Sequence, residues 1–360
     1  MKLPYEPIEP TLRSTGMKTL HKCRRKFWWA ERHGIRRGID TEAMRIGKYV
    51  HLLLEQRYLG RTAGEAYGHV VSYVDNKRAE LGKNLRDGRL KSGESYAAVS
   101  KQMTVDLEKA FACADAFLTY YPLAENQEVI ATELPFKFNV PGITQPLEGR
   151  IDLVLADKKT RQLTIVDIKT HSVSTMLRAA TNVFDVQTHL FYVAGLRHLL
   201  GLPFAPDDPI DDQKPKALHS FVPEDLTAIE YHLIRKPTIK CCKTDGYDLK
   251  AYVRRVRRWY DDETKKEMLK KFPSPPLAVT RQPIHGDPLL DGEHMMRLKE
   301  HDEAARHSTA DLDWFYKTAN EMECASVFGT CKFLDLCRTD KARAQWVPML
   351  EQSYRQEFRV

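Results

Sequence analysis

Two acidic residues and a lysine lie on consecutive strand-like segments near the middle of the chain. LTIVDIKT carries Asp167 and Lys169, and GRIDLVLAD carries Asp152, 15 positions before Asp167. Alternate residues of a strand share a face, so Asp167 and Lys169 project together from an otherwise apolar strand. The polar KKTRQ between the segments predicts an antiparallel hairpin, which brings Asp152 and Asp167 within reach of one cation.

Buried carboxylates of this kind need neutralisation, and a divalent metal with oxygen ligands commonly provides it. Such a metal suits phosphodiester hydrolysis because it lowers the pKa of water and polarises the phosphoryl group, while Lys169 neutralises developing charge. The alternative is that the acids lie at strand edges and Lys169 pairs with one of them, since D-x-K is common by chance. The apolar strand, Asp152 upstream and Glu133 on the preceding segment favour the metal site.

The order of these motifs resembles the PD-(D/E)XK nuclease superfamily. Glu133 comes first, then EGRIDLV, then IVDIKT, which is similar to the RecB-like exonucleases and their CRISPR-adaptation relatives. The resemblance implies an α/β fold with a restriction-endonuclease-like core, in which helices flank a central mixed sheet, and Mg2+ or Mn2+ as cofactor. The positions that match the family's metal ligands are His51 in IGKYVHLLLE, Asp152, Asp167 and the backbone carbonyl of Ile168.

Further catalytic residues are implied by the same resemblance. Lys169 matches the catalytic lysine, and Glu133 matches an acid that reaches a second metal or its water. The family carries Q-x-x-x-Y on the next helix. This chain has Gln187 but Phe191 at the tyrosine position, with Tyr192 following. We expect Gln187 in the active site and Tyr192 against the DNA.

Three of the seven cysteines cluster as C-x6-C-x5-C. In an intracellular chain a metal site is favoured over disulfides, although three ordinary buried thiols are the alternative. RecB-like nucleases with an iron-sulfur cluster have a fourth, upstream cysteine in a C-x-R-K-aromatic context, and HKCRRKFWW is similar. The resemblance implies a structural 4Fe-4S cluster, although zinc would satisfy the same thiolates. The four residues are Cys23, Cys324, Cys331 and Cys337.

Basic and aromatic residues are mixed beside the first of these cysteines. Arg24, Arg25 and Lys26 precede Phe27, Trp28 and Trp29, a composition expected for a single-stranded DNA channel. The alternative is a helix with a solvated basic face and a buried aromatic face, which we favour for the tryptophans. The net charge of +7, from 56 basic and 49 acidic residues, permits a polyanionic partner without requiring one.

The elements that must position these residues form one predicted domain over residues 1–360. Helices are expected at 18–31 and 44–59, with a helical insertion at 61–125. The catalytic core is expected at 126–202, with three strands and a closing helix. A strand at 226–240 and a helix at 249–272 follow, and the C-terminal third is predicted to be helical, ending in the iron-sulfur segment 320–340.

Together these patterns predict a metal-dependent DNA exonuclease acting on single strands or duplex ends in recombination, repair or processing. The alternative is a non-catalytic iron-sulfur protein that binds DNA or transfers electrons on a nuclease scaffold. The sequence contains no GxxxxGK[ST] motif, so a motor would have to come from a separate helicase or recombination protein. Without an apolar run long enough for a membrane span, the chain is expected in the cytoplasm, or the host cytoplasm if a phage encodes it.

Overall fold

A mixed five-stranded sheet forms the centre of the protein. The computed structural model describes residues 11–32, 40–86, 96–171, 186–202, 214–242, 248–268, 276–284 and 286–307, and the short pieces 325–326 and 329–330. The strands, in their order across the sheet, are β1 (Gln127–Phe138), β2 (Leu147–Asp157), β3 (Leu163–His171), β4 (Leu226–Arg235) and β5 (Leu277–Pro283). β3 and β4 are parallel, and the other neighbours are antiparallel. This confirms the predicted α/β class, including the hairpin of β2 and β3.

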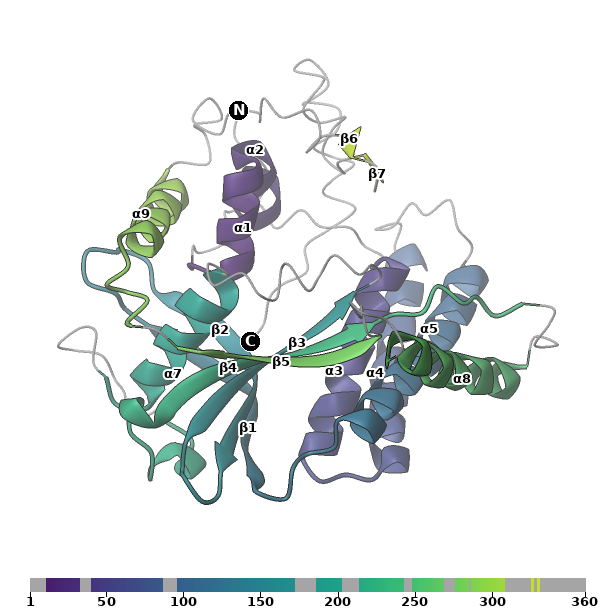
Figure 1. Cartoon of the computed structure of the whole chain (residues 1–360). Coiled ribbons are helices and arrows are strands. Elements are labelled where there is room, and N and C mark those ends of the chain that lie inside the picture. Colours follow the sequence, from purple (N-terminus) through teal and green to yellow (C-terminus); the bar gives the residue numbers. More distant parts are fainter. Residues whose placement is uncertain are drawn as a thin grey trace, which may run out of the picture.

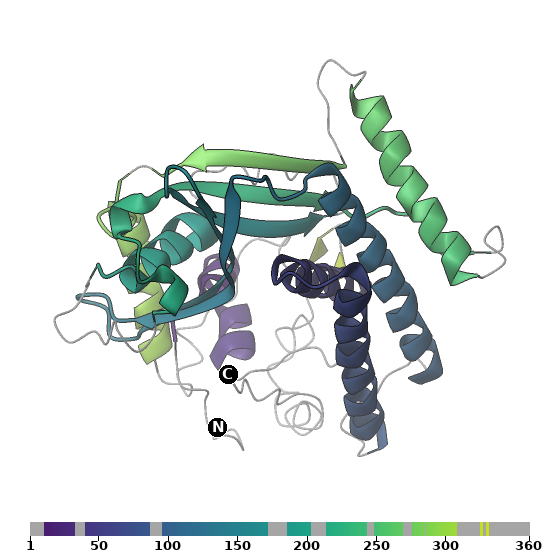
Figure 2. The ribbon, with the colours of Figure 1, turned by 90° about the horizontal axis from the view of Figure 1, so that it is seen from below.

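Helices cover the sheet in two groups (Figure 1). The first group, which packs on one apolar core, consists of α1 (Ser14–Lys22), α7 (Val193–Leu199) and α9 (Gly292–Arg306). The second group, on the other core, consists of α3 (Glu42–Tyr58), α4 (Ala63–Arg86), α5 (Tyr96–Tyr120) and α8 (Leu249–Met268). Figure 2 shows the second group gathered together, apart from the first. Among the described helices, none has the length and apolar character needed to cross a membrane.

The side chains of β3 alternate between the two sheet faces, as predicted, and so divide between the two cores. Leu163 and Ile165 belong to the first core, and Val166 and Ile168 to the second. Because successive side chains of a strand point to opposite faces, Asp167 and Lys169 fall on the side of Leu163 and Ile165. The sequence pattern therefore gave the correct facing of this strand.

Two expectations differ from the structure. The helix expected at 18–31 is interrupted at Cys23, whose extended backbone (φ −164°, ψ 113°) separates α1 from the short helix α2 (Arg24–Phe27) and the π-helical turn Trp28–Arg32. The C-terminal third, predicted to be helical, contributes the edge strand β5. This strand buries mainly its first residues, so its sequence lacks the apolar alternation of a half-buried strand.

Three glycines allow elements to approach closely. A Cβ at Gly149 or Gly195 would lie 2.4 or 2.6 Å from atoms of the Phe136 ring, so this ring is held between β2 and α7. A Cβ at Gly47 would lie 3.0 Å from Oγ1 of Thr170, at the end of β3. Glycine at position 47 therefore lets α3 approach the sheet.

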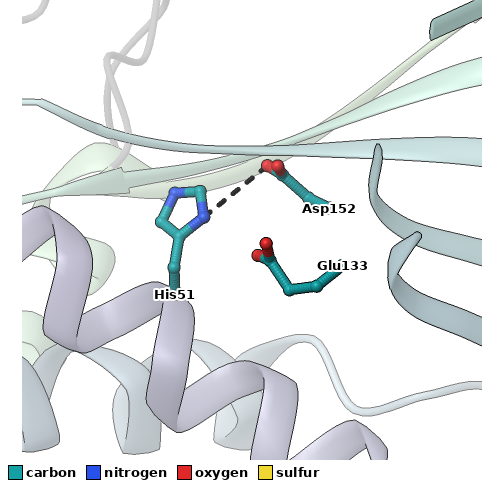
Figure 3. A group of neighbouring side chains, drawn as sticks. All are labelled: His51, Glu133 and Asp152. Atoms are coloured by element: carbon teal, nitrogen blue, oxygen red, sulfur yellow. Dashed lines mark ion pairs between the residues drawn. The ribbon is translucent and has the colours of Figure 1, made fainter. Parts of the chain in front are cut away.

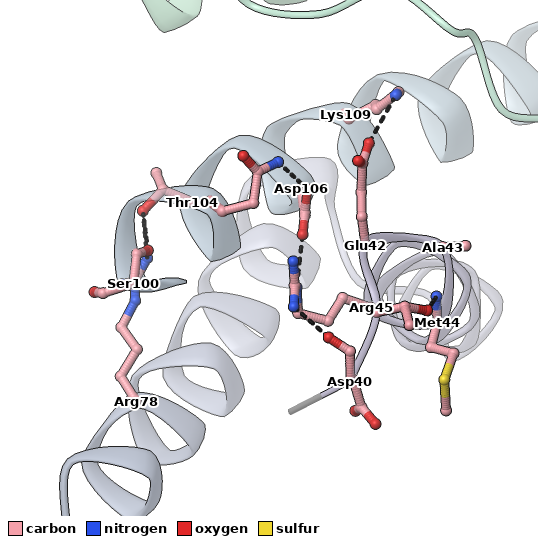
Figure 4. A network of polar contacts seen from close by, with 12 residues as sticks. Asp40, Glu42, Ala43, Met44, Arg45, Arg78, Ser100, Thr104, Asp106 and Lys109 are labelled. Atoms are coloured by element: carbon pink, nitrogen blue, oxygen red, sulfur yellow. Dashed lines mark hydrogen bonds and ion pairs between the residues drawn. The ribbon is translucent and has the colours of Figure 1, made fainter. Parts of the chain in front are cut away.

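A buried polar network joins α3 to α5 (Figure 4). The Nε of Arg45 donates to Oδ2 of Asp106 at 2.6 Å, and Gln102 donates to the other carboxylate oxygen at 2.7 Å. Lys109 also pairs with Glu42 at 3.3 Å. Breaking such a buried pair is costly because one charge would remain uncompensated. The network fixes the orientation of α3, which carries His51.

Candidate active site

Three side chains from three elements converge at one point of the sheet (Figure 3). His51 of α3, Glu133 of β1 and Asp152 of β2 each offer a ligand atom, and these atoms lie within 4.8 Å of one another. Nδ1 of His51 is 3.7 Å from Oδ2 of Asp152. One imidazole and two carboxylates are a donor set suited to a divalent cation that accepts oxygen and nitrogen ligands.

The backbone at Glu133 contributes to this convergence. Glu133 has a φ of 46°, in the left-handed region that residues with a Cβ rarely adopt. In the strand register Thr132 faces Leu153 and Leu134 faces Ile151, so Glu133 lies across from Asp152. Unfavourable backbone conformations of this kind are concentrated at functional sites.

Negative charge accumulates around Glu133. Burial, followed by the nearby Asp152 carboxylate, raises the pKa of Glu133 to about 7, and Glu55 adds to this rise. Arg150, 3.6 Å away, opposes it. The sequence did not lead us to assign Glu55 to the site. Its position one turn after His51 on α3, and so on the same helix face, was the signal that could have indicated it.

A chain of hydrogen bonds connects Asp152 to the lysine of the D-x-K motif. The hydroxyl of Tyr192 donates to Oδ1 of Asp152 at 3.2 Å and accepts from Nε2 of Gln187 at 2.7 Å. Oε1 of Gln187 accepts from Nζ of Lys169 at 3.1 Å, and the same ammonium donates to Oδ1 of Asp167 at 2.8 Å. The acids of two strands and the lysine therefore belong to one connected network.

Asp167 and Ile168, which we expected as metal ligands, have other contacts in the structure. Asp167 is fully buried and holds Lys169, and it does not belong to the described group of His51, Glu133 and Asp152. Ile168 contributes its backbone N–H, which donates to Oδ2 of Asp152 at 2.9 Å. The structure thus brings together two of the four expected metal ligands, with Glu133 as the third member.

A π-helical turn explains the displaced tyrosine. Residues Val186–Tyr192 form a π-helix, in which residues five apart, rather than four, face each other. Gln187 therefore contacts Tyr192, while Phe191 is buried in the first apolar core. The tyrosine therefore follows Gln187 by five residues instead of four, and the wider π-helical turn still brings the two side chains together. Tyr192, which we expected against the DNA, is 4% exposed and has its hydroxyl in the site.

The basic residues beside Cys23 are divided between packing and surface. Arg25 is buried, and Arg24 pairs with Glu300 of α9 at 2.8 Å. Lys26 is half-buried, as is Cys23, which is a free thiol. The other expected cluster ligands lie outside the described residues: Cys324, Cys331 and Cys337.

Comparison with protein families identifies the family to which the chain is similar. The family model described as the PD-(D/E)XK nuclease superfamily matches residues 14–338, which include every element of the site described above. A search of curated proteins found no match.

Proposed function

Because the chain belongs to the PD-(D/E)XK nuclease superfamily, we propose that it is a metal-dependent DNA exonuclease of the RecB-like type. The observation that carries the proposal is the convergence of His51, Glu133 and Asp152 within 4.8 Å. This acidic group is joined through hydrogen bonds to the ammonium group of Lys169. A nuclease needs both features, since it must hold a cation and neutralise a phosphoryl group.

The donor set fits Mg2+ or Mn2+, which His51, Glu133 and Asp152 would hold. When bound, the cation supplies Lewis-acid polarisation of the phosphoryl group and makes water a better nucleophile. The fully buried Asp167 stays a candidate ligand, as the family's pattern implies. Its hydrogen bond with Nζ of Lys169 favours a first role in orienting that lysine.

The other steps, charge neutralisation and proton transfer, are proposed for side chains of the protein. Lys169, held by Asp167 and Gln187, is positioned to neutralise negative charge on the phosphoryl oxygens. In the metal-free protein, burial and the nearby Asp152 carboxylate raise the pKa of Glu133 to about 7, so a cation that binds there would displace a proton near neutral pH. Tyr192 keeps its proton, because burial raises its pKa well above the usual value, and so donates to Asp152.

The cleavage test uses end-labelled single-stranded and duplex DNA with Mg2+ or Mn2+. We expect release of labelled mononucleotides or short products, and resistance of covalently closed circles. Asp152→Asn and Lys169→Met should each lower cleavage at least about 100-fold. Equal activity in either variant would discard the site assignment. Tight DNA binding without hydrolysis in any divalent metal would support the non-catalytic alternative instead.

We also propose that Cys23 joins Cys324, Cys331 and Cys337 in a structural 4Fe-4S cluster. Two observations support it: Cys23 is a free thiol at the break between α1 and α2, and the family match continues to residue 338. Anaerobic purification should give a brown protein containing iron and acid-labile sulfide. Zinc in their place would identify the site as a zinc site.

The biological setting proposed is processing of DNA ends in recombination, repair or CRISPR adaptation. A separate helicase or recombination protein would supply any motor activity. Strand polarity follows from the same labelled substrates when the label is moved from one end to the other.

A further inference from the structure

One arginine contacts the acidic group of the active site from its exposed side. Nη1 of Arg150, on β2, lies 3.6 Å from Oε2 of Glu133, on β1. The side chain of Arg150 is 57% exposed, whereas that of Asp152, two residues further along the same strand, is 11% exposed. The guanidinium group therefore lies at the open side of the carboxylates, where a substrate would approach.

The strand register accounts for this position. Arg150 pairs with Pro135 of β1, so Glu133 is its diagonal neighbour on the same sheet face, at a separation that long side chains span. The backbone on both sides of the arginine is tightly packed. A Cβ at Gly149 would lie 2.4 Å from an aromatic ring, and Ile151 is fully buried. The backbone of Arg150 is thus held in place, while its side chain extends toward the acid and the solvent.

The ion pair with Glu133 offsets negative charge in the metal-free protein. Burial and the Asp152 carboxylate raise the pKa of Glu133, and Arg150 opposes this rise because it favours the charged form of the acid. A divalent cation held by His51, Glu133 and Asp152 would place two further positive charges close to the guanidinium group. Sharing Glu133 with the cation would weaken the attraction that holds Arg150.

Replacing this carboxylate by a phosphate is energetically easy for the arginine. Ion pairs between partly exposed side chains contribute little to stability, because water and salt screen the attraction. A guanidinium group also forms two parallel hydrogen bonds with phosphate oxygens, a geometry that an ammonium group cannot reproduce. A phosphodiester that reached the cation would therefore meet an arginine that is close by and readily released.

We propose that Arg150 exchanges Glu133 for the phosphodiester backbone of the DNA substrate, which it binds beside the cation. The inference rests on the proposed nuclease function and deepens it, because it adds a substrate contact and couples that contact to cation binding. The coupling has a definite sign. Removing the guanidinium group should strengthen cation binding, since a repelling charge is lost, and should weaken DNA binding.

The first experiment measures cation binding without DNA. Mn2+ is titrated against the thermal unfolding midpoint at about pH 8.5, above the pKa of Glu133. Arg150→Gln should bind Mn2+ roughly three- to tenfold more tightly, and Arg150→Lys, which keeps the charge, should match the wild type. The control is Arg257→Gln. It removes a comparable ion pair between α8 and α5, in which Arg257 is 45% exposed and lies 2.9 Å from Asp115, and it should also match the wild type.

The second experiment measures DNA binding in Ca2+ by fluorescence anisotropy at several salt concentrations, and cleavage in Mg2+. Arg150→Gln should lower the slope of log affinity against log salt by about 0.7 to 0.9, which corresponds to one phosphate contact. Its KM should rise roughly tenfold, with kcat changed less than about threefold. Arg150→Lys should keep the slope but bind DNA about threefold more weakly, because the paired hydrogen bonds are lost. Arg257→Gln should match the wild type.

A merely structural role would weaken cation and DNA binding together, so a fall in both affinities in Arg150→Gln would overturn the inference. An unchanged Mn2+ affinity or an unchanged salt slope in that variant would also overturn it. If the wild-type protein binds Mn2+ and DNA without cleaving the DNA, the proposed nuclease function fails, and the two affinities still decide the role of Arg150. Absence of any DNA binding by the wild type would reject both.

Discussion

Removing the hydroxyl group of Tyr192 tests how the π-helical turn supports the cation site. In Tyr192→Phe, Oδ1 of Asp152 loses a donor at 3.2 Å and Nε2 of Gln187 loses an acceptor at 2.7 Å. The ring, buried in the first apolar core, would stay in place. The change therefore removes two hydrogen bonds without creating a cavity.

The magnitude follows from the groups involved. A hydrogen bond to a charged group contributes about 1.5 to 3 kcal/mol, but Asp152 keeps the bond from the backbone N–H of Ile168 at 2.9 Å. We therefore expect a loss of about 1 to 2 kcal/mol in the free energy of unfolding. Residues that orient a metal ligand typically change metal affinity or activity by about 10- to 100-fold, and we expect the lower end.

The assay combines two measurements. Titration of Mn2+ against the thermal unfolding midpoint reports cation affinity, and cleavage of end-labelled DNA reports kcat/KM. The double variant Phe191→Tyr/Tyr192→Phe moves the hydroxyl to the position expected for an α-helical Q-x-x-x-Y. Because Phe191 lies in the apolar core, the double variant should not recover activity, and burying its hydroxyl should cost about 1 to 3 kcal/mol more.

Two results would refute this reasoning. Wild-type Mn2+ affinity and wild-type cleavage in Tyr192→Phe would mean that the hydroxyl does not support Asp152. Recovery of activity in the double variant would mean that Gln187 faces position 191, so that the turn is α-helical in solution.

Three further predictions use other parts of the molecule. Folding raises the pKa of Glu133 from 4.5 to about 7, so its contribution to stability is present below pH 4.5 and lost as the pH rises through 7. Over this pH range the free energy of unfolding of the metal-free protein, measured with denaturant, should fall by up to about 3 kcal/mol, and Glu133→Gln should remove this pH dependence. Gly195→Ala places a Cβ 2.6 Å from the Phe136 ring and should cost about 1 to 3 kcal/mol, whereas Gly68→Ala, on α4 with nothing within 4 Å, should stabilise by about 0.5 to 1 kcal/mol in the same assay. Lys169→Met should lower kcat at least about 100-fold while DNA binding in Ca2+ persists.

The strands of the catalytic core could be predicted because their signal is local. The two-residue period of β3 set Asp167 and Lys169 on one side, and the polar turn before it gave the antiparallel pairing with β2. Such patterns depend only on neighbouring residues and on burial of one face. β5 lacked this signal because it lies at the sheet edge and is partly exposed along most of its length.

The relative placement of side chains could not be read in the same way. The period gives a face, but not whether Asp167 turns toward a cation or toward Lys169, and in the structure it holds Lys169. The π-helical turn places Tyr192, rather than Phe191, against Gln187, and the sequence carries no local signal that separates this turn from an α-helical one. Lys18 reaches Gln187 because α1 packs on the π-helical turn Val186–Tyr192 and on α9, which are remote from it in the sequence.

The charges of the site are separated. On one side lie the carboxylates of Glu55, Glu133 and Asp152, and on the other side lies the ammonium group of Lys169, which is held by Asp167. The neutral side chains between the two sides relay hydrogen bonds without changing the balance of charge. A cation and a phosphodiester bound together would neutralise both halves, so each should bind more tightly in the presence of the other.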